Sequence, residues 1–155
     1  MRLIPLSELF EVTYGVNLEL NKMKCSDDGI PFVGRSDRNN GVTAFVKPID
    51  GIEPNPAGSI SVAGGGSVLA TFLQKNAYYS GRDLFYLVPN IAMSDSVKLY
   101  YCACIRANRY RYNYGRQANK TLKNILLPSF ENIPEWVFDG VNRGIKNVAS
   151  QLSLL

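Results

Sequence analysis

The segment 106–120 alternates cations with tyrosines and side-chain amides, in the order Arg-Ala-Asn-Arg-Tyr-Arg-Tyr-Asn-Tyr-Gly-Arg-Gln-Ala-Asn-Lys. Cations pair with phosphates, phenol rings stack on bases, and amides hydrogen-bond base edges. Residues 96–130 contain seven Lys/Arg and no Asp/Glu, whereas the rest of the chain has ten basic residues against thirteen acidic ones. The formal net charge of +4 therefore comes wholly from one segment, as is typical of a nucleic-acid contact surface. A solvated helix face is the alternative, but three tyrosines suit it poorly.

Arg116, Gln117 and Asn119 bring together the two kinds of side chain that read bases. The guanidinium matches O6 and N7 of guanine, and the amides match N6 and N7 of adenine. Phosphate contacts, which orient a protein without reading sequence, are expected from the cations Arg106, Arg109, Lys120 and Lys123. If four cations contact phosphates, log affinity should fall against log salt with a slope on the order of −3 to −4.

The tyrosines at 110, 112 and 114 can hydrogen-bond phosphate, pack on thymine methyl groups or stack on an extruded base. Alternate residues of an extended run face opposite ways, so one or two of these rings can instead belong to the core. We expect Tyr112 to point inward and Arg111 to point outward.

The composition excludes much catalytic chemistry. The chain has no histidine, which removes Ser-His and Cys-His nucleophiles and histidine-bound metal nucleases. The common metal-dependent nuclease core needs an acidic residue two positions before a lysine, and no such triplet occurs. Three cysteines cannot form a closed disulfide framework, so Cys102 and Cys104 are expected to be buried, reduced thiols. The sequence predicts a non-catalytic protein without metal or cofactor.

The bulk properties predict one soluble domain. A chain of 155 residues can bury one core, and no apolar run approaches the ~18 residues of a membrane span. The amino terminus lacks the features of a secretory signal, so we expect a cytoplasmic protein with no membrane contact. We divide the chain into a recognition domain over 1–130 and a carboxy-terminal helical segment over 131–155, which docks or contacts a partner.

Short β-type runs separated by Gly, Asn, Asp and Pro predict an α+β fold with a meandering antiparallel sheet or a partly closed barrel. Strands are expected at 30–33, 42–46, 59–62, 68–73, 84–88 and 125–128. Asn39-Asn40-Gly41 and Gly64–Gly66 are expected to be turns, because these residues tolerate the left-handed conformation. A strand-like run follows the three glycines, which argues against a phosphate-binding loop.

Three helices are expected to accompany this sheet. Ser7 begins a short helix that runs towards Val12, and a carboxy-terminal helix starts at Pro134. Ser94 caps a helix that begins at Asp95 and frays near 113–115. This helix packs one face on the sheet, with 3/4 spacing, through Val97, Tyr101, Cys104, Ile105 and Asn108. The cations expected to point elsewhere are Lys98, Arg106 and Arg109.

Six stretches, taken in order, resemble the target recognition domain of the DNA specificity subunits of type I restriction-modification systems and of related fused restriction-methyltransferase enzymes. They are Gly29-Ile-Pro-Phe-Val-Gly-Arg-Ser-Asp37, Asn39-Asn-Gly-Val42, Ser61-Val-Ala-Gly-Gly-Gly-Ser-Val68, Arg82-Asp-Leu-Phe-Tyr-Leu-Val-Pro89, Tyr112-Asn-Tyr-Gly115 and Leu122-Lys-Asn-Ile-Leu-Leu-Pro128. The resemblance spans roughly residues 5 to 130. The sequence departs from the usual subunit in showing one such domain rather than two, and no long spacer helix.

The resemblance implies a strongly bent sheet that reads a few base pairs of duplex DNA for an associated methyltransferase and possibly restriction subunits. Such a domain is not itself catalytic, so S-adenosylmethionine, ATP and Mg²⁺ would belong to partner subunits. It also implies a DNA-facing role for the residues Arg35, Arg38, Asn39, Asn40, Ser67 and the segment from Tyr112 through Tyr114 to Lys120. Two copies of the chain, as a homodimer, would read a symmetric site.

Two other functions stay open at this point. The chain can be a protein-interaction module, a decoy or regulator that occupies a restriction-modification partner through its last helix. It can also bind single strands or RNA, where aromatic stacking rather than paired amide readout carries the affinity.

Overall fold

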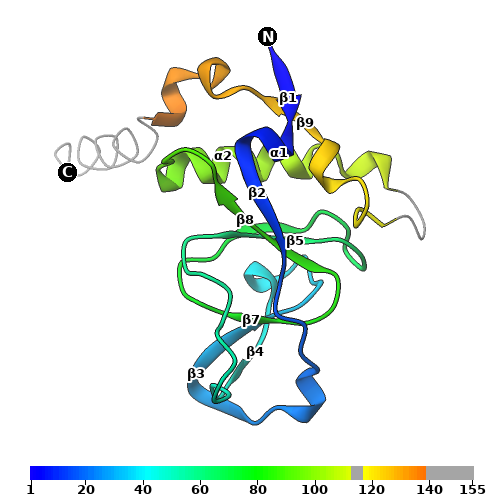
Figure 1. Cartoon of the computed structure of the whole chain (residues 1–155), viewed down its shortest axis with the longest axis vertical. Coiled ribbons are helices and arrows are strands. Elements are labelled where there is room, and N and C mark those ends of the chain that lie inside the picture. Colours follow the sequence, from blue (N-terminus) through cyan, green and yellow to red (C-terminus); the bar gives the residue numbers. More distant parts are fainter. Residues whose placement is uncertain (113–116, 139–155) are drawn as a thin grey trace, which may run out of the picture.

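The computed structural model describes residues 1–112 and 117–138 (Figure 1). At its centre is a four-stranded antiparallel sheet in the order β2-β8-β5-β6. Its strands are β2 (Phe10–Tyr14), β5 (Ile60–Ala63), β6 (Thr71–Leu73) and β8 (Leu84–Pro89). Every residue of β5 is buried, which fits a strand with neighbours on both edges and packing on both faces.

A second sheet forms the lower end of the molecule in Figure 1, in the order β4-β3-β7. Its strands are β3 (Cys25–Val33), β4 (Val42–Val46) and β7 (Tyr79–Ser80). β3 pairs antiparallel with β4 and parallel with β7. Phe32, Val46 and Tyr79 make a small core of their own beneath it. Val33 of β3 also packs with Leu84 of β8, so loop 34–41, which connects β3 to β4, projects from a lobe that is joined to the central sheet.

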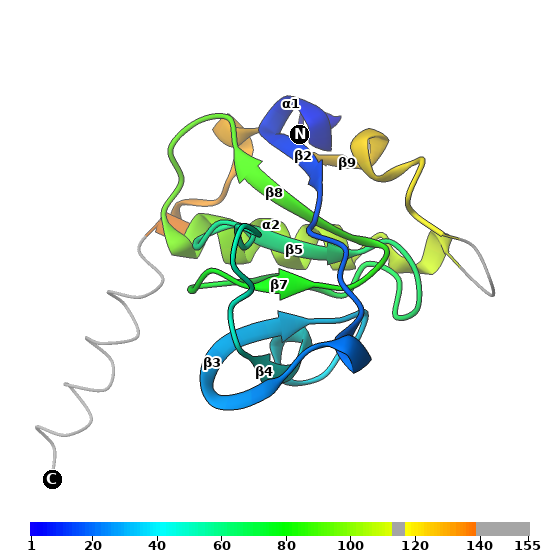
Figure 2. The same cartoon turned by 60° about the horizontal axis from the view of Figure 1, so that its bottom comes forward.

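Helix α2 (Asp95–Arg106) lies beside the central sheet in both Figure 1 and Figure 2. The Ser94 hydroxyl accepts a hydrogen bond of 3.3 Å from the Val97 amide, so the expected cap is confirmed. The buried face consists of Val97, Tyr101, Cys102 and Ile105. It packs into the main core with residues of β5, β8 and the segment 118–137. Of the two neighbouring cysteines, Cys102 is thus fully buried and Cys104 only half-buried.

The upper end of the molecule is built from the chain's first residues and from the segment after residue 117 (Figure 1). β1 (Leu3–Pro5) pairs antiparallel with β9 (Leu126–Pro128), and α1 (Leu6–Leu9) follows β1 directly. Short 3-10 turns complete the described chain at Leu20–Lys22, Asn39–Gly41, Arg109–Arg111, Leu122–Asn124 and Phe130–Asn132.

The expected α+β class with mostly antiparallel strands is confirmed, but three details are wrong. Helix α1 begins after Pro5 and ends at Leu9, because Phe10 already pairs with Pro89 in the sheet. The strand expected over 68–73 is shorter, since Leu69 has a positive φ of 61° and belongs to a turn. Helix α2 ends at Arg106, earlier than expected. The expected carboxy-terminal helix from Pro134 is helical from Glu135 to Phe138, and its remainder over 139–155 lies outside the described residues.

Candidate nucleic-acid interface

The glycine turn, residues Gly64–Gly66, draws three distant segments together. The Gly64 amide donates to the Asp83 carbonyl over 2.7 Å, and the Gly64 carbonyl accepts from the Ala118 amide over 2.8 Å. The Ser67 amide donates to the Arg35 carbonyl over 3.2 Å. Gly66 has a φ of 61°, which confirms the predicted turn and explains a glycine there. Three nominated residues therefore become neighbours. They are Arg35 in loop 34–41, Ser67 beside the glycine turn and Gln117 in the segment that bonds to the turn through Ala118.

Asp83 organises the side chains at this meeting point. Its carboxylate accepts from Arg35 Nη1 at 3.3 Å and from Asn119 Nδ2 at 3.0 Å. Asn119 lies directly against Gly64, where a Cβ atom would be 2.0 Å from Asn119 Oδ1. That oxygen is buried and has no hydrogen-bond partner in the described part of the chain. Asn119 is therefore held inward by Asp83, and Gly64 supplies the space that it needs.

Gln117 is exposed beside Arg35. A Cβ atom on Gly65 would be 3.2 Å from Arg35 Nη1 and 3.5 Å from Gln117 Nε2, so both side chains border the same glycine. Arg35 is half-buried, and its described side-chain hydrogen bond uses only Nη1. A guanidinium and a primary amide, the groups that match guanine and adenine, thus lie side by side.

Gln117 also lines an open cavity of about 430 Å³, together with Arg111, Tyr112, Thr121, Asn124 and Ile125. Tyr112 is half-buried against the main core, and its hydroxyl is 2.7 Å from Thr121 Oγ1. Arg111 is exposed and lies over the Tyr110 ring at 5.5 Å. The expected inward Tyr112 and outward Arg111 are confirmed. Lys120 and Lys123 are exposed nearby, while Tyr114 and Arg116 lie outside the described residues.

Positive φ angles and side-chain hydrogen bonds hold the residues of loop 34–41 that were expected to contact DNA. Asn39, Asn40 and Gly41 all have positive φ, at 53°, 57° and 74°. The side-chain Nδ2 of Asn39 donates to the Val42 carbonyl at 3.1 Å, and the side-chain Nδ2 of Asn40 donates to the Leu73 carbonyl at 3.3 Å. These two amides therefore already hold the turn. Arg38 is exposed, and no ion pair or side-chain hydrogen bond of its guanidinium is found among the described residues.

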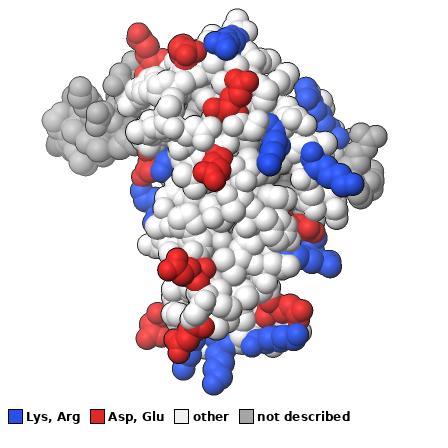
Figure 3. Space-filling model, viewed as in Figure 1, with Lys and Arg blue, Asp and Glu red and all other residues white. Residues whose placement is uncertain are grey.

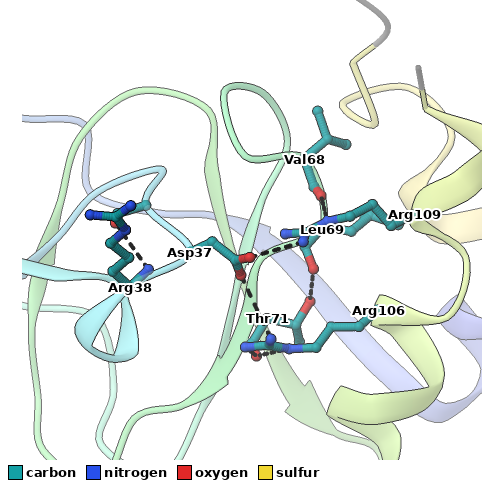
Figure 4. A network of polar contacts seen from close by, with 8 residues as sticks. Asp37, Arg38, Val68, Leu69, Thr71, Arg106 and Arg109 are labelled. Atoms are coloured by element: carbon teal, nitrogen blue, oxygen red, sulfur yellow. Dashed lines mark hydrogen bonds and ion pairs between the residues drawn. The ribbon is translucent and has the colours of Figure 1, made fainter. Parts of the chain in front are cut away.

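Arg106 and Arg109 are bound within the protein (Figure 4). Arg106 Nε and Nη2 donate to the Thr71 carbonyl at 2.9 and 2.8 Å, and its guanidinium lies 4.4 Å from the centre of the Phe72 ring. Arg109 Nε donates to the Val68 carbonyl at 2.8 Å. Lys98 Nζ likewise donates to the Gly58 carbonyl at 2.8 Å. The expectation that these three cations point away from the sheet is wrong, because each long side chain reaches back to a backbone oxygen.

Asp37 completes the contacts of the arginine pair. Its Oδ2 lies 2.9 Å from Arg109 Nη1, and its Oδ1 lies 3.6 Å from Arg106 Nη1. The hydrogen bond from Arg109 holds the pKa of the Asp37 carboxyl below its usual value. Sequence reasoning nominated neither Asp37 nor Asp83. The available signal was their position within two of the stretches that resemble recognition-domain landmarks.

Comparison with known proteins identifies the family. A family model described as the type I restriction modification DNA specificity domain matches residues 2–133. The chain belongs to this family. It is 28% identical over 152 residues to the type II restriction enzyme BgcI specificity subunit S.BcgI of Heyndrickxia coagulans, with 95% of this chain and 43% of that protein covered. The resemblance inferred from the six stretches is thus confirmed.

Solved structures of specificity subunits share the fold of this specificity domain. The HsdS subunit from Thermoanaerobacter tengcongensis aligns with a TM-score of 0.65 at 17% identity, covering 96% of this chain and 38% of that one. The S subunit of a type I restriction-modification system from M. genitalium aligns with a TM-score of 0.58 at 17% identity, covering 99% and 43%. The chain therefore spans less than half the length of these relatives.

Charge is unevenly distributed over the specificity domain (Figure 3). In the view shown, several Lys and Arg side chains lie along the upper right edge, whereas the lower lobe carries both signs. Within residues 1–112 and 117–138, no helix is long and apolar enough to cross a membrane. The same residues contain no group of three His, Cys, Asp or Glu side chains that could hold a metal ion.

Proposed function

We propose that this specificity domain reads a short sequence in duplex DNA through the face around the glycine turn, and so directs a restriction-modification enzyme to its target. The observation that carries the proposal is the convergence of Arg35 and Gln117 at Gly65, two side chains that are 82 positions apart in the sequence. They supply one donor pair for guanine and one donor-acceptor pair for adenine. The family membership of the chain supports the same function.

The roles within this face differ from residue to residue. Arg35, Arg38 and Gln117 are the described side chains that we assign to base edges, and Arg116 joins them on its sequence alone. Lys120, Lys123 and Arg111 are exposed and serve as phosphate contacts. Asn119, Asn39 and Asn40 hold the face in shape, since their amides are bonded within the protein. Each base-reading pair contributes ~1–3 kcal/mol of discrimination.

Catalysis is assigned to partner subunits, a methyltransferase and a restriction subunit, which would also hold S-adenosylmethionine, ATP and Mg²⁺. Segment 131–155 is the proposed partner contact, and two copies of the chain would read a symmetric target. A cytoplasmic location, where duplex DNA and such partners meet, fits this role.

The test is selection from a random duplex library with the full chain, followed by affinity measurements on the selected duplex, a scrambled duplex, and the selected sequence as single strand and as RNA. We expect enrichment of one short motif and preference for the selected duplex. Arg35→Ala should weaken binding to that duplex by roughly 5- to 150-fold and relax the preference at one position, as expected for a bidentate base contact. Arg116→Ala should relax the preference in the same way.

Two lysine variants serve as matched controls. Lys123→Ala should weaken binding to all duplexes alike and make the salt slope shallower by about 1. Lys47→Ala, at the end of β4 in the lower lobe, should change neither affinity nor preference. Absence of any enriched motif, or equal affinity for duplex and single strand, would refute duplex recognition. Capture of a methyltransferase without any DNA shift would favour the interaction-module alternative.

A further inference from the structure

The guanidinium groups of Arg106 and Arg109 are both held by groups of the protein itself. Arg106 directs Nε and Nη2 at the Thr71 carbonyl and Nη1 at Asp37. Arg109 directs Nε at the Val68 carbonyl and Nη1 at Asp37, and its Nη2 is buried and has no hydrogen-bond partner among the described residues. A phosphate that drew either guanidinium outward would leave a carbonyl or a carboxylate without its donor.

These contacts join three parts of the fold (Figure 4). Arg106 ends helix α2 and Arg109 begins the 3-10 turn after it, so both are fixed to the helix. Val68 and Thr71 lie at the turn into β6, the strand on which loop 34–41 rests. Asp37 belongs to that loop. The helix end, the β5–β6 turn and the loop between β3 and β4 are therefore locked at one point.

Loop 34–41 is held at three places along its length. The Arg35 carbonyl accepts from the Ser67 amide at 3.2 Å. The Asn40 side chain donates to the Leu73 carbonyl at 3.3 Å, and the Gln74 side chain donates to the Asn40 carbonyl at 2.8 Å. Between these two points of attachment, Asp37 pairs with Arg106 and Arg109. Without it, the stretch around Arg38 keeps, among the described residues, only hydrogen bonds within the loop, from the Arg38 backbone amide to Ser36 Oγ at 3.1 Å and from the Gly41 amide to the Arg38 carbonyl at 2.9 Å.

We propose that Asp37, Arg106 and Arg109 form a positioning clamp that fixes the exposed Arg38 for base reading and that makes no phosphate contact itself. The proposal deepens the function argued above and rests on it. Arg38 lies on the side of Asp37 away from the arginine pair (Figure 4), next along the chain from the clamped residue. A loop fixed before binding loses little conformational entropy on binding, so the clamp acts on the specific complex rather than on general attraction to DNA.

The clamp and a phosphate contact predict opposite results for the same variants. If Asp37 only repels DNA, Asp37→Ala should strengthen binding to every duplex and steepen the salt slope. If Asp37 positions Arg38, Asp37→Ala should weaken binding to the selected duplex by about tenfold, while binding to the scrambled duplex stays the same or rises. The ratio of the two affinities therefore separates the two roles.

Arg109→Gln makes the second comparison, with Lys123→Ala as the phosphate-contact control. The clamp predicts that Arg109→Gln lowers the affinity ratio and leaves the salt slope of the scrambled duplex unchanged, whereas Lys123→Ala makes that slope shallower by about 0.9. A shallower slope in Arg109→Gln, with equal losses on both duplexes, would overturn the proposal. Circular dichroism melts identify any variant that fails to fold.

Hydrogen exchange provides a readout that does not depend on DNA. Amides of residues 34–41 should exchange faster in Asp37→Ala than in the wild type, and should be unaffected by Asp27→Ala, which removes an exposed carboxylate from β3. Unchanged exchange in Asp37→Ala would overturn the clamp. If the wild type itself fails to discriminate between duplexes, the proposed function fails, and the exchange experiment still decides whether the clamp exists.

Discussion

Substitution of Gly64 by alanine tests the packing that holds the reading face together. The φ of Gly64 lies outside the left-handed region, so the backbone accepts alanine and only space is at issue. The new Cβ would be 2.0 Å from Asn119 Oδ1 and 2.9 Å from Phe85 Cε2. Asn119 must therefore move, and its 3.0 Å hydrogen bond to Asp83 is lost. We expect the side chains around Gly65 to lose their alignment as well.

The magnitude follows from the two contacts. Loss of a hydrogen bond to a charged group costs ~1.5–3 kcal/mol. Overpacking against Phe85 adds a cost of ~1–3 kcal/mol, of which part relaxes. We therefore expect Gly64→Ala to lower the free energy of unfolding by roughly 2–4 kcal/mol. In an Asn119→Ala background, only the clash with Phe85 remains. The same substitution should then cost about 1.5–3 kcal/mol less, the value of the hydrogen bond, which is the coupling between the two positions.

Urea denaturation of the wild type, both single variants and the double variant measures this coupling. Gly81→Ala is the matched control, because its Cβ would meet Phe32 atoms at an ordinary 3.6 Å. We expect the control to change the free energy of unfolding by less than about 0.5 kcal/mol. Costs that add within ~0.3–0.5 kcal/mol would refute the close approach of Asn119 to Gly64.

Two further predictions concern ionisable groups. Burial raises the pKa of the Cys102 thiol to about 12, whereas Cys25 is exposed. An aromatic disulfide reagent at pH 8 should therefore react with Cys25 first. The Cys25→Ser variant should lack this fast phase of the reaction. Rapid reaction at Cys102 would contradict the packing of α2. The folded-state pKa of Asp37 is lowered mainly by the hydrogen bond from Arg109, so its stabilisation is present above the unfolded pKa and is lost as pH falls through the folded one. The difference in urea midpoint between the wild type and Asp37→Asn should thus be largest at neutral pH and disappear once the pH falls below the folded-state pKa, and a pH-independent difference would exclude this linkage.

Local signals predicted the elements that depend on local interactions. The β4 strand, the Ser94 cap and the Asn39–Gly41 turn follow from propensity, capping and positive φ, all of which act within a few residues. Strand β2 was not predicted, although its pattern suits a strand. What decides it is the ladder with β8, more than 70 positions away in the sequence. The expected helix keeps Ser7 and Glu8 in α1 but gives way to this ladder from Phe10 onward, as tertiary context commonly overrides propensity.

The candidate site likewise combines features that the sequence predicted with features that distant contacts in the fold determine. The sequence indicated which residue types contact nucleic acid, and the fold brings Arg35, Ser67 and Gln117 to one turn. Their division into reading and supporting side chains was not predictable, because it depends on Asp37 and Asp83. A carboxylate in a turn gives no sign of which distant cation or amide it will meet.

The separation into reading and supporting side chains also changes which cations can contribute to the salt dependence of DNA affinity. Counting charges over 96–130 treats seven cations as equivalent, but Arg106 and Arg109 share Asp37 as an ion-pair partner and Lys98 is bonded to a carbonyl. The remaining cations of the segment are Arg111, Arg116, Lys120 and Lys123. With Arg116 at a base edge, the three phosphate contacts Arg111, Lys120 and Lys123 give a slope of about −2.7 on duplex DNA, whereas a phosphate contact at Arg116 would bring it to about −3.6. Arg116→Ala should therefore relax the preference while the slope stays the same, so measuring slope and preference together in each variant assigns every cation to one role.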